Sequence, residues 1–506
     1  MDYDRNNETE IHKTPIQKFY AAQSILITGS TGFLGKMLVE KLLRSCPDIS
    51  TIYLLIRSKK DECPKSRLDD IFEKPLFNRL KEEMPNFRKK VVPIICDFNV
   101  ENLGLSENDK NMLIRKVSII FHLAATVRFD EEIKTSAIIN VISTNVILDM
   151  AKHMLNLKSF IHVSTLYANC TRNVKHIEER FYTYPIDHRT LITFTRTSSE
   201  NIIDEKLAKI ASSWPNTYTF TKAMAETLLR DEGRDLSIGI FRPAIVTPSA
   251  REPIVGWGEN LYGAVGSILF TLLGFSRIQW CDPDSQANLV PVDFTVNALI
   301  VSAWDVSNQC RKGKDILIYN YISAAKSPTW REGINKLICI NQKYPLKDSI
   351  WLPFIYLIRR EIPYKICTWF CHLLPAFLID GVRICTGRRP RMWKLYSKIH
   401  KATKSVAYFS TNTWYYTDDN VQTMWNRLNK EDQQLFQFNM NELDWTKYLT
   451  DFHKGMRLYL LNEDDSNLET NRINYKRLYW THQIFKTVFI FVTLCIIWNI
   501  FIKIFA

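Results

Sequence analysis

The sequence lacks the features that define several other classes of protein. Only 16 of its 506 residues are glycine, less than half of the usual share of about 7%, and it contains no low-complexity segment or internal repeat. Hydrophobic residues make up 46% and charged residues 24% of the chain, which are ordinary values for a folded protein. Collagen-like, disordered and disulfide-scaffold proteins are therefore excluded, and the length predicts roughly two to four structural units.

The cysteines form no pattern typical of a metal centre or a redox pair. There are 11, none of them in a CxxC pair, and the closest two are Cys367 and Cys371. We interpret them as reduced thiols in a protein that faces the cytosol, and we predict no metal site. The net charge of +13 suits phosphate-bearing ligands or a membrane face. Without a zinc-ligand array, an RNA-binding signature or a long basic helix, no nucleic-acid partner is expected.

The two ends of the chain differ in polarity. Residues 1–20 form a polar segment with no apolar signal core, so secretion is not expected. Residues 484–505 are mostly apolar, and their only charged residues are Lys486 and Lys503, whose long side chains can reach the lipid headgroups. We predict a single transmembrane anchor here, with the main body on the cytosolic side because a basic pair precedes it. A buried or hairpin-forming helix is the alternative.

Short apolar runs alternate with helical stretches over the first half of the chain. A near-continuously apolar run that is rich in β-branched residues is typical of a buried strand. Parallel sheets with helices on both faces are built from such strands. The sequence therefore predicts an α/β fold with a doubly wound parallel sheet. Its six expected strands are 24–28, 51–56, 91–96, 117–123, 160–164 and 238–241.

The pattern changes after about residue 320. Aromatic and basic residues become dense from 349 to 393, and charges such as Asp380 interrupt the apolar stretches 350–358 and 366–384. We predict that these stretches are helices that pack on the protein or lie at a membrane surface and do not span it. Ordinary core helices are the alternative. Residues 414–462 predict a separate small helical unit.

A glycine-rich loop follows the first expected strand and opens a helix. Its sequence is TGSTGFLG, in which Gly29 permits a tight turn, Gly32 lets the backbone approach a pyrophosphate, and Gly35 allows close helix–strand packing. The N-terminus of the helix adds N–H groups and a positive dipole. An ordinary strand–helix turn is the alternative. We expect a dinucleotide to contact Thr28, Gly29, Thr31, Gly32, Phe33, Leu34 and Gly35.

Basic residues follow the second expected strand, where this fold meets the adenosine ribose. Arg57 ends the strand, and Lys59 and Lys60 lie close by. An acidic residue at this place prefers a free 2′-hydroxyl, whereas a basic one accommodates a 2′-phosphate. The sequence therefore predicts NADPH as the cofactor, with Arg57 and Lys59 as ligands. A solvated surface arginine is the alternative.

Three further strand ends complete the expected cofactor site. Asp97 ends the third strand and has the chemistry to bind the adenine amine, and Ala124 at the end of the fourth leaves room for a cofactor. Pro243, after the sixth strand, belongs to the same expected set. Asn140 lies in the helix after the fourth strand, where we expect it to hold a water or a backbone group.

The third motif is YTFTK, in which Tyr218 is the only tyrosine of 21 with a lysine four positions on. Residues i and i+4 share a helix face. A free tyrosine has a pKa near 10, and a neighbouring ammonium lowers this pKa by favouring the phenolate. Tyr218 and Lys222 are therefore predicted as a catalytic pair, in which the lysine also binds the nicotinamide ribose. A solvent-exposed helix pair is the alternative.

A hydroxyl-bearing strand end accompanies this pair. The sequence HVST places Ser164 and Thr165 after the fifth expected strand, where a hydroxyl can bind the substrate carbonyl and the tyrosine. Alternation along a strand allows only one of the two to point inward. The sequence leaves open which of them does.

Together these motifs resemble the extended branch of the short-chain dehydrogenase/reductase superfamily, and within it the alcohol-forming fatty acyl-CoA reductases. The resemblance covers about residues 15–463, and its motifs are specific in combination. Ser143, Glu259 and Ala264 depart from residues common in that family. The similar segments are 28–35, 53–57 (YLLIR), 122–130 (HLAATVRFD), 162–169 (HVSTLYAN), 177–179, 215–222 (PNTYTFTK), 241–246 (FRPAIV), 252–260 (EPIVGWGEN), 290–293, 372–380 (HLLPAFLID) and 445–463.

The resemblance implies an extended Rossmann fold and an activity. After the polar segment 1–20, it implies an NADPH-binding reductase domain over 21–345, a smaller helical C-terminal domain over 346–465, and the membrane helix at 484–505. The activity is reduction of a long-chain fatty acyl-CoA to a primary alcohol and coenzyme A, in two hydride transfers through a bound aldehyde. Tyr218 would donate the proton, helped by Ser164 or Thr165.

Other functions stay open at this point. A reductase of the same superfamily that acts on a sterol or a nucleotide sugar would need a single hydride per product. A non-catalytic membrane scaffold would need neither the glycine loop nor the Tyr218–Lys222 pair. The sequence fits a tail anchor in either the endoplasmic reticulum or the peroxisome, and we favour the former because its last three residues, IFA, are not the peroxisomal type. Candidates for the acyl groove are 257–275 and 349–384.

Overall fold

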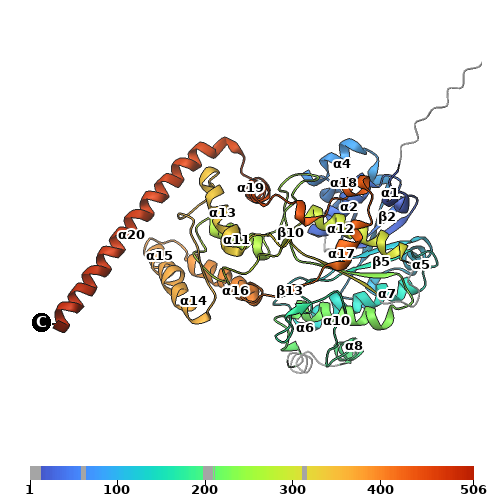
Figure 1. Ribbon diagram of the computed structural model, residues 1–506, viewed down its shortest axis with the longest axis horizontal. Helices are drawn as coiled ribbons and strands as arrows, with labels where there is room; N and C mark the ends of the chain where they lie inside the picture. The colour runs from blue at the N-terminus through green and yellow to red at the C-terminus, as the bar shows by residue number, and fades with distance from the viewer. Residues whose placement is uncertain (1–12, 58–63, 198–208, 210, 310–315, 506) are drawn as a thin grey trace, which may run out of the picture. The chain divides into compact units, whose positions relative to one another are not determined.

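The computed structural model describes residues 13–57, 64–197, 209, 211–309 and 316–505 (Figure 1). The chain divides into two compact units, each assembled from separate stretches of sequence. Unit 1 comprises Met1–Val246, Leu289–Ser323 and Trp414–Glu442, and unit 2 comprises Thr247–Asn288, Ala324–Thr413 and Leu443–Ala506. The boundary at 345/346 that the family resemblance implies stays a prediction.

Unit 1 is built on a seven-stranded sheet in the order β11-β7-β5-β4-β1-β2-β3. Every pairing in it is parallel. The order reverses between β1 and β4, which creates the switch point at which such folds bind ligands. The predicted doubly wound parallel sheet is confirmed. Its strands are β1 Ser24–Thr28, β2 Thr51–Arg57, β3 Val91–Cys96, β4 Ile119–His122, β5 Ser159–Val163, β7 Ile238–Pro243 and β11 Leu317–Tyr321.

Helices cover both faces of this sheet (Figure 1). Alternate strand residues such as Leu26, Ile120 and Phe160 share one apolar core with the helices α5, α7 and α10, whereas α2 and α12 pack together on the other face. The helices of unit 1 are α1 Pro15–Tyr20, α2 Phe33–Ser45, α3 Pro64–Phe72, α4 Asn78–Glu83, α5 Glu107–Lys116, α6 Ile133–Ala137, α7 Ser143–Lys152, α8 His188–Thr197, α10 Thr217–Glu232, α12 Val292–Asn308, α17 Asp419–Asn426 and α18 Lys430–Leu435.

Two short strand pairs stand apart from the main sheet. Strand β6, His176–Ile177, pairs with β13, Tyr415–Tyr416, within unit 1. Strand β8, Ile245–Thr247, pairs with β10, Leu289–Pro291. The first of these pairs brings a late segment of the chain back to the loop that follows β5.

Unit 2 is mostly helical. Its helices are α11 Gly263–Leu272, α13 Trp330–Lys343, α14 Glu361–Thr368, α15 Leu374–Cys385, α16 Met392–Thr411, α19 Trp445–Gly455 and α20 Leu468–Phe505. The short strands β9, Ile278–Trp280, and β12, Tyr356–Ile358, pair in parallel. The stretch 350–358, which we predicted to be helical, therefore contains a strand, because pairing with β9 overrides its apolar pattern.

The segment 414–462 does not form the separate unit that we predicted. Its first part packs into unit 1, where the Arg427 guanidinium lies 2.6 Å from the Asp305 carboxylate. Its last part packs into unit 2, where His453 Nε2 lies 3.0 Å from Asn341 Oδ1. Ion pairs and hydrogen bonds with distant segments decide this division, and sequence patterning does not show them.

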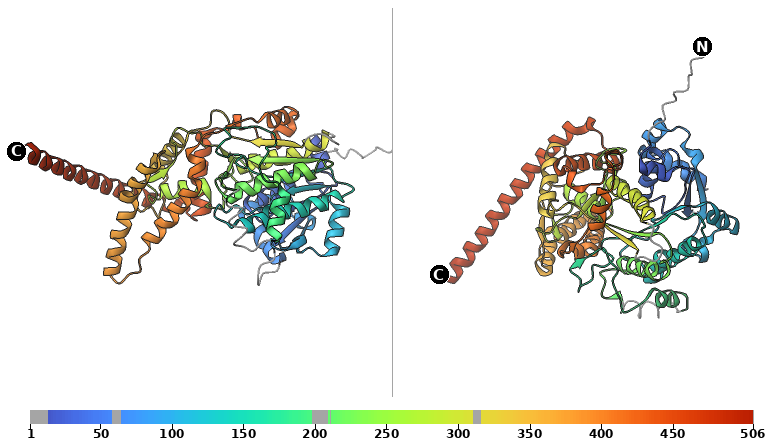
Figure 2. Two further views of the ribbon diagram at one scale, coloured as in Figure 1. Left: turned by 90° about the horizontal axis from the view of Figure 1, so that it is seen from below. Right: turned by 45° about the vertical axis from the view of Figure 1, so that its right-hand side comes forward.

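Two helices in the described part of the chain are long and apolar enough to cross a membrane. They are Glu361–Cys385 and Asp465–Ile504, with mean hydropathies of 1.3 and 2.2 in their most apolar stretches. The second covers α20 up to Ile504, and most of α20 runs clear of the other helices of its unit in every view (Figures 1 and 2). By length and composition, α20 suits the anchor that the sequence predicts.

Candidate active site

The glycine-rich loop joins β1 to α2 with the close contacts that its spacing predicts. Gly29 has φ +70°, and a Cβ atom there would lie 2.8 Å from the Ala124 backbone nitrogen. A Cβ atom on Gly35 would lie 2.3 Å from the Gly29 carbonyl oxygen. Both contacts are too short for any side chain, so these two positions require glycine.

The loop fits the phosphates of a dinucleotide. Gly32 is exposed and is the N-cap residue of α2, where glycine has no side chain to cap the helix. Thr31, Phe33 and Leu34 beside it are half-buried. The start of α2 therefore presents backbone N–H groups and the positive end of the helix dipole, which suit a pyrophosphate.

A hydrogen-bonded histidine holds the two strands at the switch point together. The Ala124 amide donates to Thr28 Oγ1 at 3.0 Å, and Thr28 Oγ1 lies 2.8 Å from His122 Nδ1. His122 Nε2 lies 3.0 Å from Thr144 Oγ1, whose proton already goes to the Asn140 carbonyl oxygen. Nε2 therefore donates and Nδ1 accepts. Burial and the nearby Lys222 charge lower the pKa of His122 to about 3, so the ring stays neutral.

Two arginines lie where the adenosine end of a cofactor would bind. Arg57 ends β2 with an exposed side chain. Arg67 on α3 donates to the Arg57 carbonyl oxygen at 2.8 Å and to Thr31 Oγ1 at 3.4 Å. Sequence reasoning missed Arg67, because it lies beyond Lys59 on a helix that folds back to the loop. Lys59 itself lies outside the described residues.

Asp97 and Pro243 lie at different parts of the sheet edge. Asp97 follows the edge strand β3, and its Oδ1 accepts from the Asn99 amide at 2.9 Å. Pro243 ends β7, and its carbonyl oxygen accepts from the Leu166 amide at 3.0 Å. Pro243 is thus beside the end of β5, where Ser164 and Thr165 follow, whereas Asp97 lies two strands beyond β1.

Tyr218 stands in the first turn of α10, which is capped by Asn216. The Asn216 side chain accepts from the Thr219 amide at 2.9 Å, and the Tyr218 ring stacks on Phe129 with centroids 6.0 Å apart. Burial raises the pKa of Tyr218 to about 12, and a side-chain hydrogen bond with Thr165 opposes this rise. The tyrosine is therefore protonated at neutral pH.

Lys222 does not lower the pKa of Tyr218 as we predicted. Its Nζ donates to the Val163 carbonyl oxygen at 2.7 Å inside the protein. Burial lowers the pKa of Lys222 to about 8, against the attraction of the Glu226 carboxylate. The i, i+4 spacing was right about the shared face, but desolvation decides the pKa of the tyrosine.

The structure distinguishes the two neighbouring hydroxyls. β5 ends at Val163, so Ser164 and Thr165 both lie past the strand. Ser164 Oγ donates to Glu226 Oε1 at 2.5 Å, whereas the Thr165 hydroxyl bonds with Tyr218. Of the two candidates, Thr165 is therefore the one that meets the tyrosine, and Ser164 belongs to a neighbouring polar cluster.

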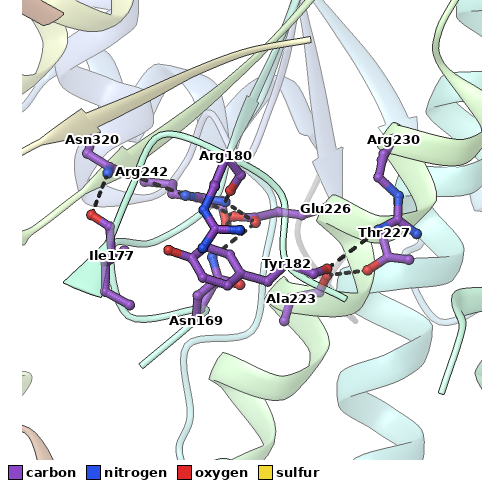
Figure 3. Close-up of polar contacts among 12 residues, drawn as sticks. Asn169, Ile177, Arg180, Tyr182, Ala223, Glu226, Thr227, Arg230, Arg242 and Asn320 are labelled. Atoms are coloured by element: carbon purple, nitrogen blue, oxygen red, sulfur yellow. Dashed lines mark hydrogen bonds and ion pairs between the residues drawn. The ribbon is translucent and has the colours of Figure 1, made fainter. Parts of the chain in front are cut away.

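That cluster centres on a buried ion pair (Figure 3). The Arg242 guanidinium donates two hydrogen bonds to the Glu226 carboxylate, from Nε to Oε1 at 2.9 Å and from Nη2 to Oε2 at 2.6 Å. It also donates to the carbonyl oxygens of Glu178 and Arg180, each at 3.1 Å. Asn169 donates to the same carboxylate at 3.3 Å. The pair fixes α10 against β7 and the loop after β5.

Sequence reasoning missed this ion pair, although a signal was present. Glu226 follows Lys222 by four residues and so lies on the same face of α10. Arg242 interrupts the otherwise apolar strand β7, and its side chain is completely buried. A charged residue in a buried strand needs a partner.

Asn140 connects the cofactor side to α10. It lies in the π-helical turn Ile138–Ile142 between α6 and α7. Its Oδ1 accepts from the Thr126 amide at 2.9 Å, and its Nδ2 donates to Thr221 Oγ1 at 2.9 Å. The backbone contact is as predicted, and π-helical turns of this kind often occur at functional sites.

The fold and these residues define a nicotinamide-dependent reductase of the Rossmann class. Among solved structures, the fold is similar to the terminal R domain from the myxalamid PKS-NRPS biosynthetic pathway, with a TM-score of 0.59 and 21% identity over 88% of this chain and 93% of that one. It is also similar to the reductase domain of a non-ribosomal peptide synthetase from Mycobacterium tuberculosis, with a TM-score of 0.58 and 19% identity over 87% and 92%.

Sequence comparison is more specific. Two family models described as male sterility protein match residues 27–299 and 371–463. The chain is 37% identical to fatty acyl-CoA reductase wat of Drosophila melanogaster over 94% of this chain and 92% of that protein. It is 37% identical to fatty acyl-CoA reductase 1 of Mus musculus over 96% and 93%, and 36% identical over the same shares to fatty acyl-CoA reductase 1 of Homo sapiens. The chain belongs to the fatty acyl-CoA reductase family and is an oxidoreductase.

Proposed function

We propose that this protein reduces a long-chain fatty acyl-CoA to a primary alcohol with NADPH, in two steps through a bound aldehyde. The observation that carries the proposal is the meeting of Thr165, Tyr218 and Lys222 at the end of β5, beside a loop that fits a dinucleotide. Family membership supplies the substrate class. The reduced nicotinamide supplies the hydride in each step.

Tyr218 serves as the acid. With a pKa raised to about 12, its hydroxyl is protonated at neutral pH and can donate to the oxyanion that develops on the thioester carbonyl. Thr165 bonds with the tyrosine and stabilises the same oxygen. The resulting thiohemiacetal breaks its C–S bond and releases coenzyme A as the thiol. The aldehyde then accepts a second hydride and a second proton at the same place.

In this proposal Lys222 binds the cofactor and orients it. Its Nζ keeps a proton at neutral pH because its pKa is about 8, and the Val163 carbonyl holds it in place at 2.7 Å. The ammonium has further N–H groups with which to donate to the ribose hydroxyls of the cofactor. The proposed mechanism needs no covalent cysteine intermediate.

Counting cofactor against product tests this function. In detergent-solubilised protein, two NADPH should be consumed for each fatty alcohol over a panel of saturated acyl-CoAs, with one chain length preferred. Aldehyde as the final product would contradict the second step. One NADPH per product, with a sterol or another carbonyl as the better substrate, would contradict the substrate class.

The preference for NADPH is proposed from Arg57 and Arg67. Guanidinium groups bind phosphate through paired hydrogen bonds, and Arg67 already contacts Thr31 of the phosphate loop. We expect R67Q and R57Q each to raise the KM for NADPH about tenfold while leaving the KM for NADH nearly unchanged. R115Q, which removes an exposed arginine on α5, is the control. An unchanged NADPH/NADH ratio in both variants would contradict the assignment.

The protein is proposed to be anchored in the endoplasmic reticulum membrane by α20, with unit 1 and the rest of unit 2 in the cytosol. The outer part of α20 exposes large apolar side chains such as Phe489, Phe491 and Trp498, and Lys476 and Arg477 precede it on the side expected to face the cytosol. In sealed microsomes, added protease should digest unit 1 and the part of unit 2 that precedes α20. Protection of either unit would contradict the orientation.

A further inference from the structure

The helix formed by α14, the π-helical turn Trp369–Leu373 and α15 has its polar side inward. Buried residues recur at every fourth position along it, and three of the five are polar. This spacing places them in one stripe along the helix. A helix on the surface of a water-soluble protein has the opposite arrangement. The stripe consists of Tyr364, Thr368, His372, Ala376 and Asp380.

Two of the inward polar residues, His372 and Asp380, have specific hydrogen-bond partners within unit 2. His372 Nε2 accepts from the Arg277 amide at 3.0 Å, and its Nδ1 lies 3.0 Å from His400 Nε2 on α16. The Asp380 carboxylate accepts from three successive amides, those of Arg391, Met392 and Trp393, at 2.9, 3.0 and 2.8 Å. These bonds cap α16 and fix which face of α14–α15 points inward.

The opposite face is apolar and exposed. Its side chains include Ile362, Trp369, Phe370, Phe377, Leu378 and Val382, with exposed fractions between 50% and 73%. Soluble proteins rarely expose a continuous apolar surface that includes several aromatic rings. We call this surface, from Ile362 to Val382, the α14–α15 face.

Cationic and aromatic residues lie at one end of this face. The loop 386–391, with sequence TGRRPR, joins α15 to α16, and Arg388, Arg389 and Arg391 are all exposed in it. Trp393 follows with 46% of its surface exposed. Arginines beside an apolar helix suit anionic lipid headgroups, and tryptophan favours the boundary between headgroups and acyl chains.

We propose that the α14–α15 face is a second membrane contact, which lies in the surface layer of the bilayer and does not cross it. The apolar side chains enter the acyl boundary, and the arginine loop binds anionic headgroups. Crossing is disfavoured because the polar stripe stays packed on α16 and Arg277. The choice of a bilayer over a protein partner rests on the proposed anchor α20, which belongs to the same unit and brings it to a membrane.

Photocrosslinking of the full chain tests this proposal. The protein would be placed in nanodiscs of phosphatidylcholine and phosphatidylserine, with p-benzoylphenylalanine introduced singly at Phe377, Phe489 or Leu155. Phe377 represents the α14–α15 face, Phe489 represents α20, and Leu155 is an exposed apolar residue of unit 1. We expect lipid adducts from the first two positions and none from the third.

The other outcomes separate the two claims. Lipid adducts at Phe489 with none at Phe377 would overturn the surface contact and leave the anchor standing. A covalent dimer formed from Phe377 would show that a second copy covers the face, which also overturns the proposal. Loss of adducts at Phe489, with adducts kept at Phe377, would remove the anchor alone.

The arginine loop has its own test. R388Q/R389Q/R391Q should reduce the yield of lipid adducts at Phe377 about fivefold in nanodiscs that contain phosphatidylserine. K89Q/R115Q/K116Q, which removes the same charge from exposed positions in unit 1, should leave the yield unchanged. Equal yields in the two triple variants would overturn the role of the arginines.

Discussion

Helix α10 of unit 1 and the α14–α15 helix of unit 2 both bury polar side chains at helical spacing, yet their other faces differ. Around Lys222 and Glu226 on α10, the apolar residues Phe220 and Met224 are completely buried as well. Around His372 and Asp380, the apolar side chains are exposed. Buried polar groups show where a helix contacts protein in both cases. The exposed apolar face of α14–α15 is the part that we propose to contact lipid.

The buried polar groups also have different consequences in the two helices. On α10 they fix the helix so that Tyr218 and Lys222 lie beside Thr165 at the end of β5, the proposed catalytic site. On the α14–α15 helix they keep the polar stripe against the protein, so that the apolar α14–α15 face points outward. In both places a carboxylate lies in an apolar stretch of sequence, and its partner lies on the element that follows the helix, Arg242 on β7 for Glu226 and the start of α16 for Asp380. The comparison can be tested in unit 1 by activity and in unit 2 by stability.

The largest effect is expected from Y218F. Removal of the hydroxyl takes away the proposed proton donor, so turnover should fall about 10³-fold, within the range of general-acid contributions. Cofactor binding, followed by quenching of intrinsic fluorescence, should be unchanged. Y415F, at an exposed tyrosine of the same unit, is the control. Near-normal turnover of Y218F would remove the tyrosine from the mechanism.

The comparison of the two helices is tested by a matched pair of truncations. F220A on α10 removes a fully buried ring that packs on Trp214 with centroids 5.0 Å apart, and it should lower the free energy of unfolding by about 3–5 kcal/mol. F377A removes a ring that is 67% exposed and should change it by less than about 0.5 kcal/mol. Denaturant unfolding in detergent measures both. A large loss in F377A would mean that the α14–α15 face is packed on protein.

Substitution of the two hydroxyl residues after β5 should have different effects, one mainly on activity and the other mainly on stability. T165V removes the group that bonds with Tyr218 and should lower kcat about 10²-fold. S164A leaves Glu226 with one donor fewer, which should cost about 1–3 kcal/mol of stability and change kcat only a few-fold. Steady-state kinetics and urea unfolding distinguish the two. The reverse pattern would show that Ser164 is the active hydroxyl.

The smallest effect concerns the pH dependence of stability. Burial lowers the pKa of Lys222 to about 8 from an ordinary value of 10.5, so between these values the unfolded chain binds more protons than the folded one. Stability that depends on Lys222 therefore rises as pH increases across this window and is lost as pH falls through about 8. The rise, measured against K222M, should be about 1–3 kcal/mol. Parallel stability curves would contradict it.

The sheet could largely be predicted from the sequence. The runs 24–28 and 91–96 coincide with β1 and β3, because apolar, β-branched runs bounded by turn residues are typical of buried parallel strands. Strand β11 was missed. Its sequence is LIYNY, and periodicity does not distinguish so short an apolar run from part of a buried helix. It also contains the polar residue Asn320, whose burial makes sense only in the folded protein, where its side chain donates to the Ile177 carbonyl oxygen at 3.3 Å.

The site was predicted in part. Glycine spacing identifies the loop, because tight turns and close packing require glycine at fixed positions. The choice between Ser164 and Thr165 could not be made, because the strand ends before either residue. The raised pKa of Tyr218 could not be predicted either, because it depends on burial by segments distant in sequence. The pairing of Glu226 with Arg242 is different, because the charged residue in the buried strand β7 was a signal that sequence reasoning did not use.

The most direct test of the central claim follows the hydride itself. NADPH that carries deuterium at the transferred position would be supplied with a saturated acyl-CoA, and the product would be analysed by mass spectrometry. The proposed mechanism predicts an alcohol with two deuterium atoms on its first carbon, and about 10³-fold slower formation of this alcohol in Y218F. An alcohol with one deuterium atom or none would contradict two hydride transfers to the acyl carbon.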